Sequence, residues 1–316
     1  INQLPYAVST TPDQKPRAIF VSALRDMPLA GNFEFELQGN EKDFQTGLTA
    51  LSKIAKTYLG IGAQQTSSAL TSAKDVEVNV FDGPCPAGNV GVQVNNIAPV
   101  NKGEVVWTVD PTAVIFFGRL FNTGIRRLVA VAGSEINNPA YAEVLAGQPI
   151  SSLLEGKLAK KGHVRIINGN PLTGRKCTAE DFVGGHTSEI TVIPEGDNVD
   201  EMLGWILPRT NDFSVSRSYL SWLFGKNKEY DLDARIKGGE RHMIMSGEYD
   251  KVLPMDIYGE YLVKAIIAGD IDRMEQLGIY EVAPEDFAVA EFVDSSKLEL
   301  QHIVRKGLDM LRKENA

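Results

Sequence analysis

The residues that could carry redox or metal chemistry are few and widely spaced. The two cysteines, Cys85 and Cys177, form no Cys-x-x-Cys pair, whereas an iron–sulfur cluster needs about four thiolates. Cys85 stands between two prolines with no basic neighbour, so we expect an inert thiol. The histidines never recur at a spacing of three or four residues, and we expect no metal site; they are His163, His186, His242 and His302.

Gly60-Ile61-Gly62 is a candidate for nucleotide chemistry, because it is half of the Gly-x-Gly-x-x-Gly fingerprint. Gln65 stands at the third glycine position, and no acidic residue clearly follows about 20 residues later to bind a ribose. A lone Gly-x-Gly in a chain with 29 glycines is a weak signal. We favour a structural turn here over dinucleotide binding.

A stiff surface loop over residues 82–88 is the third candidate. The valine-rich alternation in residues 76–81 and 90–94 predicts two half-buried strands, which the loop would join. Its prolines restrict the backbone, so docking a partner there costs little ordering entropy. A simple connection is the plainer interpretation, and an interface loop is the functional one, with the candidate residues Asp82, Gly83, Pro84, Pro86 and Gly88.

The elements around these candidates predict a Rossmann-like α/β domain over residues 1–125. We expect residues 1–16, with three prolines, to form an extended lead-in, and residues 17–23 to form a buried strand. The apolar residues in 41–58 recur at helical spacing, which predicts a helix that Asn40 caps and Gly60 ends. With the strands near residues 76–94, this β-α-β-α-β succession is typical of an open sheet.

The rest of the chain predicts two further domains, so the fold class is α/β plus α+β. Strand patterns separated by the turn signals at 137–139 and 168–171 predict a β-grasp domain over residues 126–213. Helical spacing after residue 254, with Pro254 in a first turn, predicts a C-terminal helical domain over residues 214–316. Asp270 is the expected cap of a helix in this domain.

Composition excludes several classes of function. The formal net charge of −9 over 316 residues argues against nucleic-acid binding and against broad docking on anionic lipid. No segment reaches the ~18 to 20 apolar residues that a membrane span needs.

Two aromatic groups could sandwich a planar ring system, although core packing is the simpler role. Any of them that is exposed in a patch would mark a partner surface. They are Trp107, Phe116, Phe117 and Phe121 in one group, and Trp205, Phe213, Tyr219, Trp222 and Phe224 in the other.

Several motifs resemble those of the A subunit of the bacterial Na+-translocating NADH:quinone reductase. They are the loop DGPCPAG at 82–88, PVN at 99–101, FGRLFNTG at 117–124, FSVSR at 213–217 and the C-terminal segment from YDKVLPMDI onward. The resemblance extends along nearly the whole chain. It implies a Rossmann-like domain related to the flavin-binding subunit of respiratory complex I, a β-grasp domain of the SLBB type and a helical C-terminal domain.

The resemblance also implies the function. We expect a peripheral subunit without its own cofactor, on the cytoplasmic face of the membrane, that helps to assemble the complex and to bind quinone during Na+ export. The flavins and the iron–sulfur cluster are expected in partner subunits, which include integral membrane subunits. Full-length family members carry a further N-terminal region, so we expect a fragment here. Pro5 and Tyr6 are the predicted quinone or partner contacts.

Two alternatives stay open at this point. The first is a stand-alone flavin- or dinucleotide-binding oxidoreductase that uses the Rossmann-like domain, as the flavin subunit of complex I does. The second is a sensor that binds a small ligand through the β-grasp domain.

Overall fold

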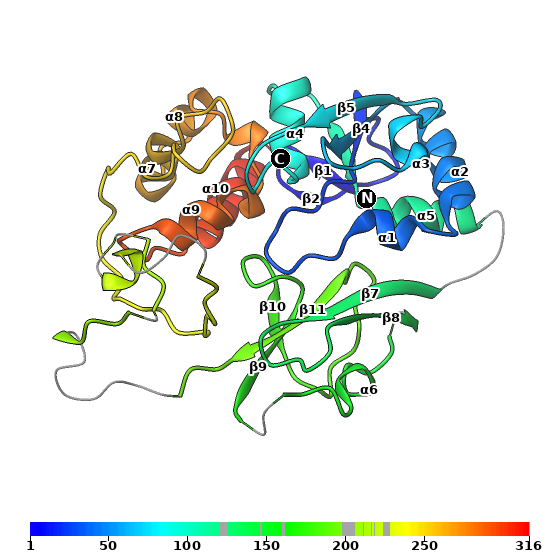
Figure 1. Ribbon diagram of the computed structural model, residues 1–316. Helices are drawn as coiled ribbons and strands as arrows, with labels where there is room; N and C mark the ends of the chain where they lie inside the picture. The colour runs from blue at the N-terminus through cyan, green and yellow to red at the C-terminus, as the bar shows by residue number, and fades with distance from the viewer. Residues whose placement is uncertain are drawn as a thin grey trace.

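A computed structural model describes residues 1–120, 126–145, 147–159, 162–197, 206–210, 212–215, 217, 219–223 and 228–315. Figure 1 shows an α/β part, a β-sheet part below it, and a helical part beside it that contains the C-terminus. Both predicted sheets and the C-terminal helices are present, so the predicted fold class is confirmed. The domain boundaries at residues 125 and 213 stay predictions.

The first sheet has the strand order β2-β1-β6-β3-β4-β5. Its strands β6, β3, β4 and β5 are parallel, while β1 runs antiparallel to β6 and to β2. All residues of β3 are buried, which explains its unbroken apolar run. The strands are β1 Asn2–Leu4, β2 Val8–Ser9, β3 Ala18–Ser22, β4 Lys56–Gly62, β5 Glu77–Phe81 and β6 Val106–Val109.

Five helices accompany this sheet. α2 and α5 pack closely because glycines lie where they cross, and a Cβ on Gly118 would stand 1.8 Å from the carbonyl oxygen of Asp43. α4 packs against β3. The helices are α1 Phe33–Leu37, α2 Glu41–Ser52, α3 Ser68–Thr71, α4 Val90–Ile97 and α5 Pro111–Leu120.

The prediction of a strand over residues 90–94 is wrong, because these residues form α4. Val90 and Val94, one helical turn apart, face the cluster that includes Phe20 of β3. Val92 points into the core of the C-terminal domain instead. Because opposite sides of this helix are buried in two different cores, apolar residues recur at every second position. The alternation of valines therefore did not identify a strand here.

Three other local predictions were wrong. The extended lead-in predicted over residues 1–16 is instead a paired structure, because β1 and β2 form a hairpin at the sheet edge. The predicted helix over 41–58 ends at Ser52, and Gly60 lies inside β4. Pro254 does not begin a helix, because α7 starts at Gly259.

The second sheet has the order β10-β9-β11-β7-β8. Its neighbouring strands β7 and β11, the first and the last of the sheet along the chain, run parallel to each other. β8 and β9 pair antiparallel to them, which is the β-grasp arrangement that the sequence predicts. The elements are β7 Arg126–Ala132, β8 Ala140–Leu145, α6 Ser151–Leu154, β9 Val164–Asn168, β10 Arg175–Cys177 and β11 Glu189–Pro194.

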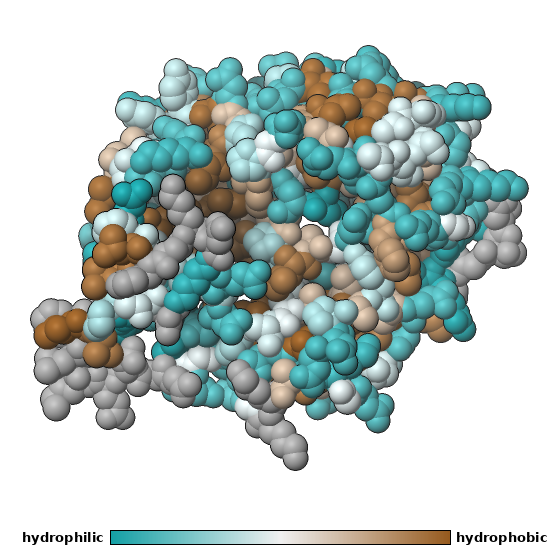
Figure 2. Space-filling view, viewed as in Figure 1, coloured by the Kyte–Doolittle hydropathy of each residue, from teal (hydrophilic) through white to brown (hydrophobic). Residues whose placement is uncertain are grey.

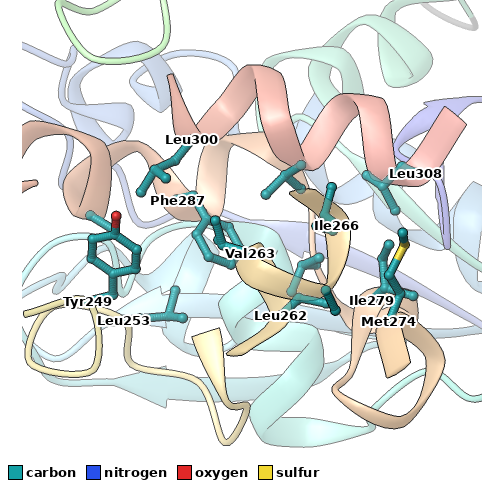
Figure 3. Close-up of a cluster of buried hydrophobic side chains, with 14 of the residues drawn as sticks. Tyr249, Leu253, Leu262, Val263, Ile266, Met274, Ile279, Phe287, Leu300 and Leu308 are labelled. Carbon is teal, nitrogen blue, oxygen red and sulfur yellow. The ribbon is translucent and has the colours of Figure 1, made fainter. Parts of the chain in front are cut away.

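The C-terminal helices enclose their own apolar core. Figure 3 shows Leu300 and Leu308 of α10 near Val263 and Ile266 of α7, with Phe287 among them. Asp270 caps α8 as predicted, because its carboxylate accepts a hydrogen bond from the Arg273 N–H at 3.1 Å. The elements are η2 Leu220–Leu223, α7 Gly259–Ala268, α8 Ile271–Gln276, η3 Ile279–Glu281, η4 Pro284–Phe287, α9 Ala288–Val293 and α10 Leu300–Glu314.

Candidate functional site at the carboxyl end of the parallel sheet

The carboxyl ends of β3 and β6 mark the point where the strand order reverses, which is where open α/β sheets usually bind ligands. In this protein the β-grasp domain lies against that edge (Figure 1). The Asn32 N–H, just before α1, donates to the Tyr141 hydroxyl of β8 at 2.6 Å. The Phe35 and Tyr141 rings stack with centroids 4.4 Å apart. The usual ligand edge is therefore a contact between two domains.

A buried charge cluster stands at this edge. Arg25, three residues after β3, bonds to the Glu36 carboxylate at 2.9 Å and to the Thr112 hydroxyl at 2.7 Å. Its guanidinium also lies 3.9 Å from the Asp110 carboxylate. Burial lowers the pKa of Arg25, but the charges of Asp110 and Glu36 outweigh that effect and raise it. Arg25 therefore stays charged and holds β3, α1 and α5 together.

Arg127 brings the β-grasp domain into this cluster. It lies on β7, is only 5% exposed, and donates to the Gly185 carbonyl. Burial lowers the pKa of Arg127, whereas the nearby charges of Asp110 and Glu36 favour its charged form. Breaking a buried charge cluster is costly, so this contact favours one arrangement of the two domains.

A cavity of about 250 Å³ lies beside the cluster, between the two domains. Its walls carry guanidinium groups and carboxylates together with apolar side chains, so neither sign of charge dominates. A site of this size is smaller than the usual range for cofactor pockets. Among its lining residues are Glu36, Gln38, Phe116, Arg119, Arg127 and Glu143.

The Gly60 position does not fit a dinucleotide. Gly60 lies within β4, not in a strand-to-helix turn, and a Cβ there would stand 1.9 Å from Oε1 of Gln93. Gln93 of α4 is 1% exposed and donates to the Ser22 hydroxyl of β3 at 2.8 Å. At the end of β4, Gln65 accepts from the Gly62 N–H at 2.8 Å. The Gln93 amide thus fills the space at Gly60, and a Leu24 methyl group lies 2.8 Å from where a Cβ of Gly62 would stand.

The N-terminus of α5 does not fit a phosphate either. Helix N-termini attract anions, because their first N–H groups are unpaired. Here the Asp110 carboxylate already accepts from the Thr112 N–H at 2.9 Å and the Ala113 N–H at 3.3 Å. A pyrophosphate would have to displace a carboxylate that also faces Arg25. The dinucleotide alternative therefore has no support at this edge.

The loop over residues 82–88 joins β5 to α4, so it connects a strand to a helix and not two strands as predicted. Asp82, Gly83 and Pro84 are exposed, whereas Pro86 is buried. At its end, the Gly88 N–H donates to Asp26 at 2.9 Å. The loop therefore presents a short exposed tip on an anchored base.

Cys85 lies near that base. Burial and the nearby Asp26 carboxylate raise the pKa of the Cys85 thiol to about 11. A thiol with a raised pKa stays protonated near neutral pH and is a poor nucleophile, which agrees with the expected inert residue.

The loop leads into a buried contact between α4 and the C-terminal domain. The Asn89 side-chain amide donates to the Asp286 carboxylate at 3.2 Å, and the Ala283 N–H donates to its other oxygen at 2.8 Å. Gly91 leaves room for this carboxylate, because a Cβ there would lie 2.3 Å from it. Burial, together with the charge of Glu285, raises the pKa of Asp286 to about 8.

Pro5 and Tyr6 form the turn of the β1–β2 hairpin, so they do not lie on a free segment. Tyr6 packs against the C-terminal core, and Arg305 of α10 donates to its carbonyl oxygen at 2.7 Å. One helical turn earlier, Gln301 donates to the Leu172 carbonyl of the β-grasp domain at 3.0 Å. The three domains therefore meet at α10, next to Tyr6.

The two predicted sites lie on different parts of the α/β domain. The hairpin turn contacts α10, whereas the loop at 82–88 begins at the opposite sheet edge and reaches η4 through Asn89. Sequence reasoning missed the charge cluster, Gln93 and Asp286. Only Arg25 had a usable signal, because polar residues directly after a buried strand often mark the ligand edge. Within the described ranges, no group of three or more His, Cys, Asp or Glu residues could hold a metal ion.

The fold and this site define a class of protein in which a Rossmann-like domain with a filled ligand edge is joined to a β-grasp domain. Family models agree: residues 1–126 match the NqrA second alpha/beta domain, and residues 128–179 match the NQRA C-terminal domain. Curated relatives extend the match along the chain. The A subunit of the Na(+)-translocating NADH-quinone reductase from Vibrio atlanticus (strain LGP32) is 35% identical, over 98% of this chain and 70% of that protein.

The A subunits from Neisseria meningitidis FAM18 and from Yersinia pestis Angola are each 34% identical, with the same coverage. The chain therefore belongs to the family of A subunits of the Na+-translocating NADH-quinone reductases, as the resemblance predicts. Among solved structures, a NAD+-reducing [NiFe]-hydrogenase in the H2-reduced state matches 57% of this chain and 41% of its own, with a TM-score of 0.42 and 12% identity. A likeness at that level defines neither fold nor function.

The Gly60–Gln93 contact gives a first prediction. Gly60→Ala should lower the free energy of unfolding by about 1–3 kcal/mol, because the new methyl group overlaps the Gln93 amide. In a Gln93→Ala background the same change should cost at least about 1 kcal/mol less. Urea denaturation of the four proteins measures this coupling. Gly239→Ala is the control, since a Cβ there meets nothing within 4 Å. Equal costs in both backgrounds would contradict the contact.

Asp286 gives a pH-dependent prediction. Its folded-state pKa of about 8 lies above the ordinary 3.8, so the folded protein keeps a proton that the unfolded chain releases. The contribution of the protonated Asp286 side chain to the free energy of unfolding is full below about pH 4, and it is lost as the pH rises towards 8. Relative to Asp286→Asn, the unaltered chain should lose up to ~1.4 kcal/mol per pH unit in that window. Urea denaturation at a series of pH values tests this, and the exposed Asp272→Asn is the control. If the free energy of unfolding of Asp286→Asn changed with pH in parallel with that of the unaltered chain, the prediction would be refuted.

Proposed function

We propose that this chain works as a peripheral subunit of a Na+-translocating NADH-quinone reductase, where it supports assembly and quinone binding. The observation that carries the proposal is the 35% identity to an A subunit of such a complex over 98% of the chain. The family name includes NADH, quinone and Na+, which are the substrates and the transported ion of the whole complex. We assign this chain a structural share of that work, not the electron transfer itself.

The filled ligand edge supports a chain without its own electron carrier. Gln93 occupies the space at Gly60, and Asp110 occupies the N-terminus of α5. A flavin or a dinucleotide would have to displace both. We therefore propose that the flavins and the iron–sulfur cluster of the complex belong to partner subunits.

The partners that we propose are the integral membrane and flavin subunits of the same complex, met at the cytoplasmic face of the membrane. Among the described residues, no helix is long and apolar enough to cross a bilayer. The exposed tip of the loop, Asp82 to Pro84, is a proposed contact, because its anchored base limits the entropy lost on docking.

Pro5 and Tyr6 are the proposed quinone contact. The half-buried Tyr6 ring lies where the hairpin meets α10, close to the β-grasp turn that Gln301 holds. An aromatic ring at such a junction can stack on a planar quinone head group.

Replacing the loop tip tests assembly. Asp82→Lys with Pro84→Ser in the tagged chain should lower co-purification of the other subunits by at least about tenfold, which corresponds to a loss of about 1.4 kcal/mol. The matched control, Asp13→Lys with Pro12→Ser, alters an equally exposed Asp–Pro pair elsewhere. Recovery of the full complex with the first variant would remove the loop from the interface. Failure of the unaltered chain to co-purify any partner would refute the proposed function.

Replacing Tyr6 tests quinone binding. In the assembled complex, Tyr6→Ala should raise the KM for quinone several-fold, because the stacking ring is lost, while leaving oxidation of NADH by an artificial acceptor unchanged. Tyr6→Phe keeps the ring and should restore the KM, and Tyr258→Ala controls for loss of an exposed tyrosine. An unchanged KM for Tyr6→Ala would end this assignment.

A further inference from the structure

An exposed apolar patch lies on the segment between the β-grasp domain and the C-terminal helices. Its side chains are between 44% and 61% exposed, and we name it the 206–223 patch: Ile206, Leu207, Leu220, Trp222 and Leu223. The Leu220 N–H donates to the Pro208 carbonyl at 3.2 Å, which holds the two parts of the patch together. In Figure 2, brown residues gather at the left edge of the molecule in this region.

The short helix η2 explains why these side chains point outward. Ser221 is 2% exposed and faces inward, while its neighbours Leu220, Trp222 and Leu223 remain accessible. Exposed large apolar residues are normal singly, but a contiguous group marks an interaction surface. Trp222 belongs to the second aromatic group of the sequence, for which exposure was the expected sign of a partner surface.

Cations accompany the aromatic rings of this segment. Arg217 lies over the Trp222 ring at 5.8 Å, and Arg209 lies over the Tyr219 ring at 5.2 Å. Residues 206–228 contain four Lys or Arg residues and one Asp, although the whole chain has a net charge of −9. This stretch therefore has a net positive charge, although Asp212 lies 3.5 Å from Arg209 and acidic residues resume at Glu229. An anionic partner complements that charge.

We propose that the 206–223 patch docks on the anionic surface of a lipid bilayer, an inference that rests on the proposed function at a membrane. Tryptophan and leucine side chains insert at the boundary between head groups and acyl chains. Guanidinium groups pair with lipid phosphates through their planar fork of donors. Each basic residue near an anionic leaflet adds to the attraction. The apolar tips and the adjacent Arg217 supply both parts of such a contact.

A second exposed apolar surface shows why charge decides the choice. Tyr258 and Tyr261, at the start of α7, and Ile267 at its end are 69%, 59% and 55% exposed. That surface is flanked by Asp256, Asp270 and Asp272 in the sequence. Lys264 and Arg273 also lie in this stretch, but the carboxylates outnumber them, so anionic lipid would not favour it. The α7 surface is therefore a control of similar exposure and net negative charge.

Vesicle flotation of the purified 316-residue chain tests the proposal. The chain should float with vesicles of phosphatidylcholine mixed with phosphatidylglycerol, more weakly with phosphatidylcholine alone, and less as salt rises. Trp222→Ser with Leu223→Ser should weaken binding to the mixed vesicles by at least about tenfold, and Arg217→Gln should remove most of the preference for phosphatidylglycerol. Tyr261→Ser with Ile267→Ser should bind as the unaltered chain does. Circular dichroism and thermal melting verify that each variant is folded.

Three results would overturn the inference. They are no flotation of the unaltered chain with the mixed vesicles, undiminished flotation of the Trp222 and Leu223 variant, or equal loss in the α7 control. If the chain does not float and the same variant loses co-purification with the other subunits, the patch binds protein and not lipid. The co-purification of the unaltered chain is measured separately, so a failed flotation leaves the proposed function standing.

Discussion

The contact between the Gln93 amide and the bare backbone of Gly60 is the constraint on which the α/β domain depends. Gln93 bonds to Ser22, and Ser22 in turn bonds to the Gly88 carbonyl, so β3, β4, α4 and the preceding loop share one buried network. This network sets where α4 begins. It thereby places Asn89 against Asp286 and Val92 in the core of the C-terminal domain.

The residues at the carboxyl end of the parallel sheet hold the domains together. After β3, Arg25 and Glu36 join a cluster that includes Arg127 of the β-grasp domain. After β5, the loop and Asn89 lead to η4. In open α/β folds these positions commonly receive a ligand. The filled ligand edge is the structural basis of our proposal that this chain is a scaffold within the reductase complex and that the electron carriers lie in other subunits.

The sequence predicts the overall architecture well, since buried strands such as residues 18–22 and amphipathic helices such as α10 have strong periodic signals. It failed where tertiary packing decides. The valines of α4 alternate because two different cores bury them, and the first strands form a hairpin that no local pattern marks. The charge cluster joins residues more than 80 positions apart, as in Arg25 and Thr112, and a single sequence does not reveal such a pairing.

The bond from Arg305 to the hairpin ends on main-chain oxygens, those of Tyr6 and Ala7. Every amino acid offers the same carbonyl, so side-chain chemistry does not enter this attachment directly, although the positive φ angles of Tyr6 (82°) and Ala7 (47°) restrict which residues fit. A substitution at position 6 therefore keeps the main-chain bond to α10, although it alters the packing of the ring against the C-terminal core. Substitutions at Arg305 have no such freedom, because one guanidinium serves both oxygens.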